Sequence, residues 1–415
     1  MCGVGAAAFL LGAAMLPVRA QVVTGNRAAI RALLDRRAAA ILSNDEDAFM
    51  ATIARSSRAF VARQRRLFEN MRGLPLGSYR LTARWDRYGD LATREDRALY
   101  PGAESVVIPV TEERYRLDGY DRAEAVEDLF YTFVERDGEW KIAEDTDLDD
   151  LTFYSTRHPW DYSPLHSERN GHFLLLTPEC AGCPEAPTGT LSLAERALDR
   201  VESYWGPAWH KRVPLVIPQG ADELKRMLQA TFDVGNFVAF AYSSVDTDNG
   251  LDYTGHRVLL NPDSFAGRAT ESTVDILAHE LLHVASRDVS GPFVPIFVEE
   301  GIAEYVGNEA DPGALAYLDA EVAAGRFTGR LPEGFEFTIG TGTDIFGAYQ
   351  RAYSAVRFFI ERWGPGRFAR FYRILGRAEI VPGTARYHLD RALEKTTGAG
   401  AGAFERAWAS SIDAS

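Results

Sequence analysis

Two histidines with a glutamate beside the first constrain this chain more than any other feature. His279-Glu280-Leu281-Leu282-His283 has the pattern HExxH. On a helix, residues i and i+4 bring their Cβ atoms within about 5–6 Å of each other, so both imidazoles can bind one metal ion. We therefore expect a helix at this position, with His279 and His283 projecting together.

The residues around this pattern also predict a helix. Apolar residues recur at helical spacing and would form a core-facing stripe on the side away from the histidines: Val274, Leu277, Leu281 and Ala285. Ser272 and Asp275 have the spacing of a capping box at the start of this helix. The prediction is a helix packed against the core on one side and open to a metal on the other.

A second predicted helix, residues 297–306, offers a carboxylate as a third ligand. It follows a turn rich in glycine and proline, and it contains Glu299, Glu300 and Glu304. Glu299 and Glu300 lie about 100° apart around a helix, so only one of them can face the metal. Two imidazoles and one carboxylate form a three-ligand zinc site with a fourth position open for water, which is typical of catalytic zinc.

HELLH, sixteen further residues and then EGIAEY resemble the gluzincin metallopeptidases, in particular the peptidase-MA-like families. The resemblance covers about residues 190–412. It implies a zincin-like fold with a mostly helical C-terminal part, and Zn²⁺ held by His279, His283 and Glu300. It also implies Glu280 as the general base that activates water, and Glu304 as a hydrogen-bond partner of a ligand histidine.

A downstream tyrosine completes the expected catalytic set. Residues 349–356, YQRAYSAV, resemble the segment of related aminopeptidases in which a tyrosine opens a helix near the zinc and donates to the oxyanion. By position this residue is Tyr349. Tyr353, one turn further on, is the rival, and ordinary packing is the alternative for both.

Two local features bear on how the site is built. Gly301 inside a helix costs about 1 kcal/mol relative to Ala, which suggests that its helix closely approaches the HELLH helix. Residues 257–262, RVLLNP, occupy the place where the related enzymes run an edge strand beside the active site. An unpaired edge can hold an extended peptide by main-chain hydrogen bonds.

The N-terminal third of the chain is predicted to form helices followed by an antiparallel sheet. Periodicity predicts helices over 26–42 and 47–71 and strands over 79–85, 105–117, 125–135 and 139–144, the last two joined by an Asp137-Gly138 hairpin. This order resembles the nuclear-transport-factor-2-like (SnoaL-like) α+β cone over residues 25–155. Because it shows no cluster of acid, base and nucleophile, we interpret it as a binding or packing module.

Prolines and glycines between residues 177 and 189 predict the linker between this cone and the second domain, residues 190–412. Cys180 and Cys183 lie in this linker, where a local disulfide is the simplest interpretation of the pair. A redox role would instead place them at the start of a helix after a strand.

The first twenty residues read as a signal peptide. An apolar run over residues 4–16 is followed by Val18 and Ala20, the small residues that signal peptidase reads. We expect an exported protein, secreted or in the cell envelope. An uncleaved segment that anchors the chain is the alternative, and membrane contact is expected only in that case.

Composition limits the remaining choices. With 46% hydrophobic residues the 415-residue chain is expected to be globular, and its net charge of −14 argues against a nucleic-acid partner. The order of the predicted helices and strands gives the expected fold class, α+β. The favoured function is a zinc peptidase acting on a peptide or protein substrate. A non-catalytic secreted binding or scaffold protein with a zinc-stabilised fold, and a zinc hydrolase of a non-peptide substrate, are the alternatives.

Overall fold

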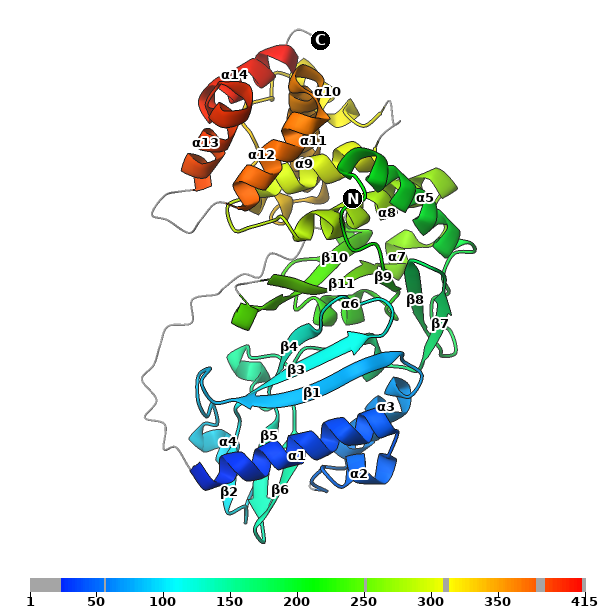
Figure 1. Ribbon diagram of the computed structural model, residues 1–415, viewed down its shortest axis with the longest axis vertical. Helices are drawn as coiled ribbons and strands as arrows, with labels where there is room; N and C mark the ends of the chain where they lie inside the picture. Colours follow the sequence, from blue (N-terminus) through cyan, green and yellow to red (C-terminus); the bar gives the residue numbers. More distant parts are fainter. Residues whose placement is uncertain (1–23, 56, 250–251, 309–312, 378–384, 413–415) are drawn as a thin grey trace.

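The computed structural model describes residues 24–55, 57–249, 252–308, 313–377 and 385–412. The expected signal peptide, residues 1–20, lies outside these ranges. The fold is mixed α+β, as predicted, with the N-terminal part at one end of the molecule and a helical C-terminal part at the other (Figure 1). Within the described ranges, no helix combines the length and apolar character that a membrane crossing requires.

The N-terminal part consists of helices and two three-stranded antiparallel sheets. Its helices are α1 (Thr24–Ser43), α2 (Glu46–Met50), α3 (Arg58–Met71) and α4 (Arg94–Ala98). Its strands are β1 (Leu76–Arg84), β2 (Ser105–Val107), β3 (Val110–Leu117), β4 (Ala125–Leu129), β5 (Thr132–Arg136) and β6 (Glu139–Glu144). The sheets have the orders β1-β3-β4 and β2-β5-β6, and α1 lies along β1 (Figure 1). The resemblance to a cone stays a prediction.

Local chemistry explains where these elements differ from prediction. The single helix expected over 47–71 is two helices, because Ser57 begins a new one by accepting a hydrogen bond from the backbone N–H of Phe60. The strand expected over 105–117 is interrupted at Pro109, which has no N–H to donate to a ladder. At the predicted hairpin, Asp137 and Gly138 have φ of 52° and 71°, as a type I′ turn requires.

A five-stranded sheet underlies the second part. Its strands are β7 (Leu165–Arg169), β8 (Phe173–Pro178), β9 (Val213–Val216), β10 (Ala239–Asp246) and β11 (Asp252–Leu260), in the order β10-β11-β9-β8-β7. β8, β9 and β11 are parallel, and the antiparallel strands β7 and β10 form the two edges. β8 and β9 are buried along their whole length, as the inner strands of such a sheet should be.

This topology changes two expectations. β7 and β8 precede residue 190, the predicted start of the second domain, and β8 overlaps the predicted linker, yet both belong to the sheet of that domain. The expected edge strand at residues 257–262 was wrong, because β11 is paired on both sides. The edge strand on that side is β10.

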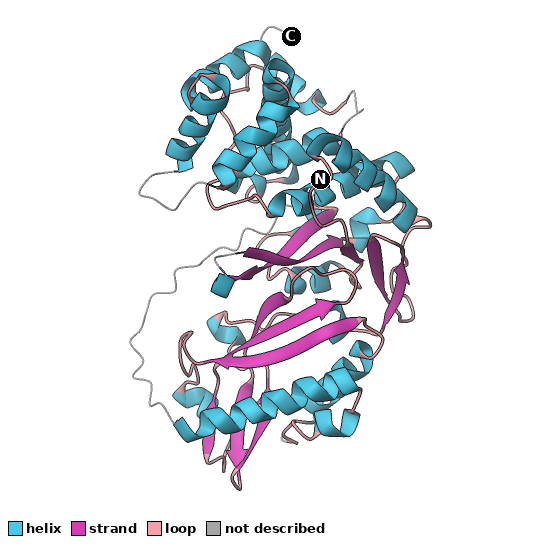
Figure 2. Cartoon of the chain, viewed as in Figure 1, coloured by secondary structure: helices cyan, strands magenta, loops and turns pink. Residues whose placement is uncertain are grey.

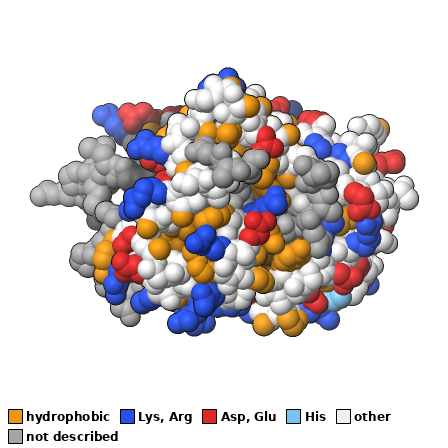
Figure 3. All heavy atoms as spheres, turned by 90° about the horizontal axis from the view of Figure 1, so that it is seen from above, with side chains coloured by type: hydrophobic (Ala, Val, Ile, Leu, Met, Phe, Trp, Pro, Cys, Tyr) orange, Lys and Arg blue, Asp and Glu red, His pale blue; other side chains and the backbone are white. Residues whose placement is uncertain are grey.

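Helices cover this sheet and form the C-terminal part. The first group is α5 (Thr190–Trp205), α6 (Ala221–Met227), α7 (Pro262–Phe265), α8 (Thr270–Arg287) and α9 (Ile296–Gly307). The second is α10 (Ala316–Ala323), α11 (Gly342–Trp363), α12 (Pro365–Gly376), α13 (Ala385–Thr397) and α14 (Ala401–Ile412). Figure 2 shows how helices replace strands toward this end, and Figure 3, viewed from above it, shows apolar, basic and acidic side chains interspersed over the surface.

A polar, buried interface joins the two parts. Arg257 of β11 donates to both carboxylate oxygens of Asp121, at 2.5 and 2.8 Å. The Glu127 carboxylate on β4 accepts hydrogen bonds from the hydroxyls of Tyr242 and Ser244 on β10. Buried charges are tolerated when they are paired in this way, so the N-terminal part is fixed against the sheet that carries α8.

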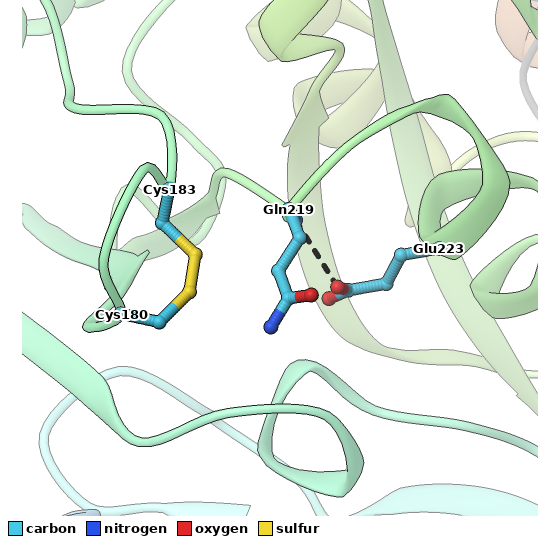
Figure 4. The surroundings of a disulfide bond; sticks show 4 residues. All are labelled: Cys180, Cys183, Gln219 and Glu223. Carbon is cyan, nitrogen blue, oxygen red and sulfur yellow. Dashed lines mark hydrogen bonds between the residues drawn. A yellow bond between two sulfur atoms is a disulfide. The ribbon is translucent and has the colours of Figure 1, made fainter.

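The loop between β8 and α5 contains a disulfide. Cys180 and Cys183 are bonded, and the backbone N–H of Cys183 donates to the carbonyl of Cys180 at 3.1 Å. Figure 4 shows this loop beside the start of α6, where the backbone N–H of Gln219 donates to Glu223. The bond therefore closes a tight turn outside the sheet.

Candidate metal centre

α8 carries the HELLH residues through the middle of the second part. It begins at Thr270, with Ala269 as its N-cap residue, so the expected capping box of Ser272 and Asp275 was wrong. Asp275 lies in the second turn instead, where its carboxylate accepts from Arg200 of α5 at 2.7 Å. From residue 276 to 287 every residue of α8 is buried, because α5, α9 and the sheet all pack against it.

His279, His283 and Glu300 lie together. Nε2 of His279 is 3.2 Å from Oε2 of Glu300 and 3.1 Å from Nε2 of His283, and Nε2 of His283 is 3.4 Å from the same Glu300 oxygen. One potential ligand atom from each residue falls within 4.8 Å of the others, and all three side chains are buried. Three donors thus converge on one point.

The choice between the two adjacent glutamates is settled by position. Glu300 faces the histidines, whereas the hydroxyl of Tyr372 donates to Glu299 at 3.5 Å on another side of α9. Burial acts to raise the pKa of Glu300, but the neighbouring imidazoles of His283 and His279 outweigh it and bring the pKa to about 2. The Glu300 carboxylate is therefore ionised over the whole physiological range.

This donor set fits zinc. Two imidazole nitrogens and one carboxylate oxygen are the ligand types that catalytic zinc sites use. The imidazoles must be neutral to bind a metal, and Glu300 must be charged. Glu280 lies on α8 beside His279 and is fully buried, so it is close to the three candidate donors without being one of them.

Glu304 lies behind the first histidine. Its Oε1 is 3.1 Å from Nδ1 of His279, on the ring edge opposite the nitrogen that faces Glu300. Asn308 donates to the other Glu304 oxygen at 2.5 Å. A carboxylate in this place fixes the tautomer and the orientation of the imidazole.

Truncation of Glu304 is expected to weaken zinc binding while leaving the fold intact. Because a carboxylate behind a ligand histidine contributes about 10–100-fold to metal affinity, Glu304→Ala should raise the zinc dissociation constant by that factor. Competition with a chromophoric chelator measures the constant. Glu361→Ala, which removes an exposed glutamate of α11 that pairs with Arg357, is the control and should bind zinc like the wild type.

Two glycines set the spacing of the helices. A Cβ at Gly301 would lie 2.6 Å from the carbonyl oxygen of Ala352, so this glycine allows close approach to α11 and not, as expected, to α8. The close approach to α8 occurs at Gly307, where a Cβ would lie 3.0 Å from the carbonyl oxygen of Asp275 and 3.3 Å from Cβ of His279. Both glycines hold α9 at the distance that brings Glu300 to the histidines.

Tyr349 lies near the donors, in the interior of α11. Its ring centroid is 6.3 Å from that of His279 and 5.1 Å from that of Phe337, and the residue is buried. The rival Tyr353 packs beside Tyr305, with ring centroids 6.4 Å apart. Of the two tyrosines, Tyr349 is the one whose ring lies beside that of His279.

Sequence reasoning missed Arg200. This α5 residue donates through one nitrogen to Asp275 of α8 and to the carbonyl oxygen of Gly307 at the end of α9, at 2.7 and 2.8 Å. It therefore ties together the two helices that supply the donors. An arginine on an amphipathic helix gives no local signal of such a role, because its partners lie 75 and 107 residues away.

The chain matches none of the known protein-family models and none of the curated proteins in sequence. Among solved structures it is similar to an M1 zinc metallopeptidase from Deinococcus radiodurans and to a mutant of a two-domain M1 zinc metallopeptidase bound to L-arginine. Each likeness has 15% identity, a TM-score of 0.33 and covers 59% of this chain. The chain spans about half the length of these structures, 51% in each case.

Proposed function

We propose that the protein is a zinc-dependent peptidase. The observation that carries this proposal is the convergence of His279, His283 and Glu300 within 4.8 Å, in the interior of the second part. Bound there, Zn²⁺ would lower the pKa of a water molecule to about 7 and polarise the carbonyl to be cleaved. The remaining steps belong to side chains of this chain.

Glu280 is the proposed general base. It takes the proton from the attacking water on its carboxylate and returns it to the leaving amine as the peptide bond breaks. Its full burial supports this role, because a carboxylate removed from bulk water exchanges protons with the substrate rather than with solvent. A scaffold that merely used zinc for stability would have no need of this residue.

Tyr349 is the proposed donor to the developing oxyanion. Its place beside the His279 ring supports this role, and a phenol O–H aimed at the new negative charge stabilises the transition state more than the ground state. Glu304 acts through His279 and is a positioning residue.

The substrate is proposed to be a peptide bound in extended form along β10. β10 is the edge strand next to β11. An edge strand can bind an extended peptide through main-chain hydrogen bonds, which depend little on the sequence of the peptide. We also propose that the chain is exported. The apolar start of the sequence and the Cys180–Cys183 disulfide both support an oxidising compartment.

The proposal is tested with an unbiased peptide library incubated with the purified, zinc-loaded protein. We expect cleavage of peptides in the library. A chelator should abolish this cleavage, and added zinc should restore it. A protein that binds zinc but cleaves no peptide in the library would be a scaffold or a hydrolase of another substrate, and screening ester and amide substrates then separates these two.

A further inference from the structure

A cavity of about 340 Å³ lies where the N-terminal part meets the end of α8. Its walls come from the turn after β3, the start of β11, and the last residues of α8 with the loop that follows. None of the three metal-binding candidates lines it. It is therefore a second site of potential binding, separate from the metal centre.

Arg287, in the last turn of α8, lines this cavity and is the feature that needs explaining. It is only 5% exposed, yet among the described residues its guanidinium forms no hydrogen bond and no ion pair, and its Nε is fully enclosed. It lies over the ring of Tyr253, whose centroid is 5.0 Å from the guanidinium carbon. Arginine stays charged in proteins. Burial raises the pKa of the Glu299 carboxylate on α9, and the charge of Arg287 acts against this rise. That carboxylate accepts from the Tyr372 hydroxyl and not from the guanidinium, so the N–H groups of Arg287 still lack an acceptor in the described part of the chain.

Two of the three acidic residues that line the cavity are paired with other arginines. Asp121 binds the Arg257 guanidinium through both oxygens, and Asp288 binds Arg122 in the same way at 2.8 and 3.1 Å. Each pair combines one negative and one positive charge, so its net charge is close to zero. Neither carboxylate is left to balance Arg287.

Other residues of the wall add positive charge or donors. The guanidinium of Arg212 lines the cavity, is exposed, and uses one nitrogen to donate to the carbonyl oxygen of Gly119. His210 lines it too, and Asp252 is an exposed acid among the lining residues. Arg287 and Arg212 together outweigh this single acid, so the cavity favours an anion.

We propose that this cavity binds an oxyanion, the carboxylate or phosphate group of a small ligand, through the guanidinium of Arg287. The guanidinium carbon lies over the Tyr253 ring, and the Nε–H of the guanidinium has no acceptor among the described residues. Carboxylate and phosphate oxygens match the N–H groups of a guanidinium in a bidentate arrangement. The site is independent of the proposed peptidase activity and does not require zinc.

Calorimetric titration of the full chain with succinate and with inorganic phosphate, at constant ionic strength, tests this proposal. At least one of the two anions should bind, and the tighter one identifies the oxyanion that the site takes. Arg287→Gln should weaken binding by at least about tenfold, because hydrogen bonds to a charged group are the strong ones. Arg373→Gln is the matched control, since Arg373 also lies at the end of a helix over an aromatic ring, that of Trp205, but does not line the cavity.

Arg212→Gln provides a second test that does not depend on the folding of a variant at a buried position. Because Arg212 is exposed, this variant should fold normally and bind the anion several-fold more weakly. Equal weakening in Arg373→Gln would show a general charge effect and overturn the proposal. Binding of neither anion to the wild type, or unchanged affinity in Arg287→Gln, would overturn it as well.

Discussion

Replacement of Glu280 by Gln is expected to lower kcat for peptide hydrolysis by about 10²–10⁴-fold, since general acid–base catalysis contributes a factor of that size. The amide has nearly the same shape as the carboxylate but cannot take a proton from water. Because Glu280 is not one of the three converging donors, zinc content should stay as in the wild type. Steady-state cleavage of a library-derived peptide, with metal analysis of the same sample, measures both effects.

Glu271→Gln is the control for this experiment. Glu271 lies in the first turn of α8, is exposed, and pairs with Arg196 of α5, so its loss changes the charge of the same helix far from the donors. It should leave kcat unchanged. Hydrolysis by Glu280→Gln at a rate near that of the wild type would refute the assignment of Glu280 as the base.

Removal of the charge of Asp121 is expected to destabilise the fold by about 3–5 kcal/mol, the usual cost of leaving one partner of a buried ion pair alone. Arg257 and Asp121 have side chains only 6% and 2% exposed, and they join the N-terminal part to β11. In Asp121→Asn the Arg257 guanidinium stays charged and buried without a counter-charge. Urea unfolding, followed by far-UV circular dichroism, measures the free energy of unfolding.

The neighbouring pair of Arg122 and Asp288 provides the comparison. It also joins the two parts with two hydrogen bonds, but Arg122 is 61% exposed. Solvent screens an exposed pair, so Arg122→Ala should cost within about 1 kcal/mol. Equal, small losses of stability in both variants would show that the interface does not depend on the buried pair.

The parts of the site that lie within one helix could be predicted from sequence. The spacing of His279 and His283 fixes their relation through helix geometry alone, and the pair Glu300 and Glu304 shares a face for the same reason. In the structure the side chains of His283, Glu300 and Glu304 each approach a ring nitrogen of His279 to within 3.2 Å. Their roles in zinc binding and catalysis stay predictions that the experiments above test.

What the sequence could not give were relations between distant segments. Gly301 indicates that another element approaches its helix closely. The sequence could not show that this element is α11, because that depends on how α8, α9 and α11 pack together. The run at residues 257–260 looks like a strand, yet whether it is an edge depends on the pairing of β9 and β10 on its two sides. α8 begins at Thr270, ahead of Ser272, so the spacing of a capping box did not mark the start of this helix.

The central claim, that His279, His283 and Glu300 hold one zinc ion, is tested most directly by the metal content of the purified chain. Inductively coupled plasma mass spectrometry should find about one zinc per chain in the wild type, and little zinc in a His279→Ala, His283→Ala double variant that keeps the wild-type circular dichroism spectrum. Equal zinc in the two proteins, or none in the wild type after incubation with zinc, would contradict the claim.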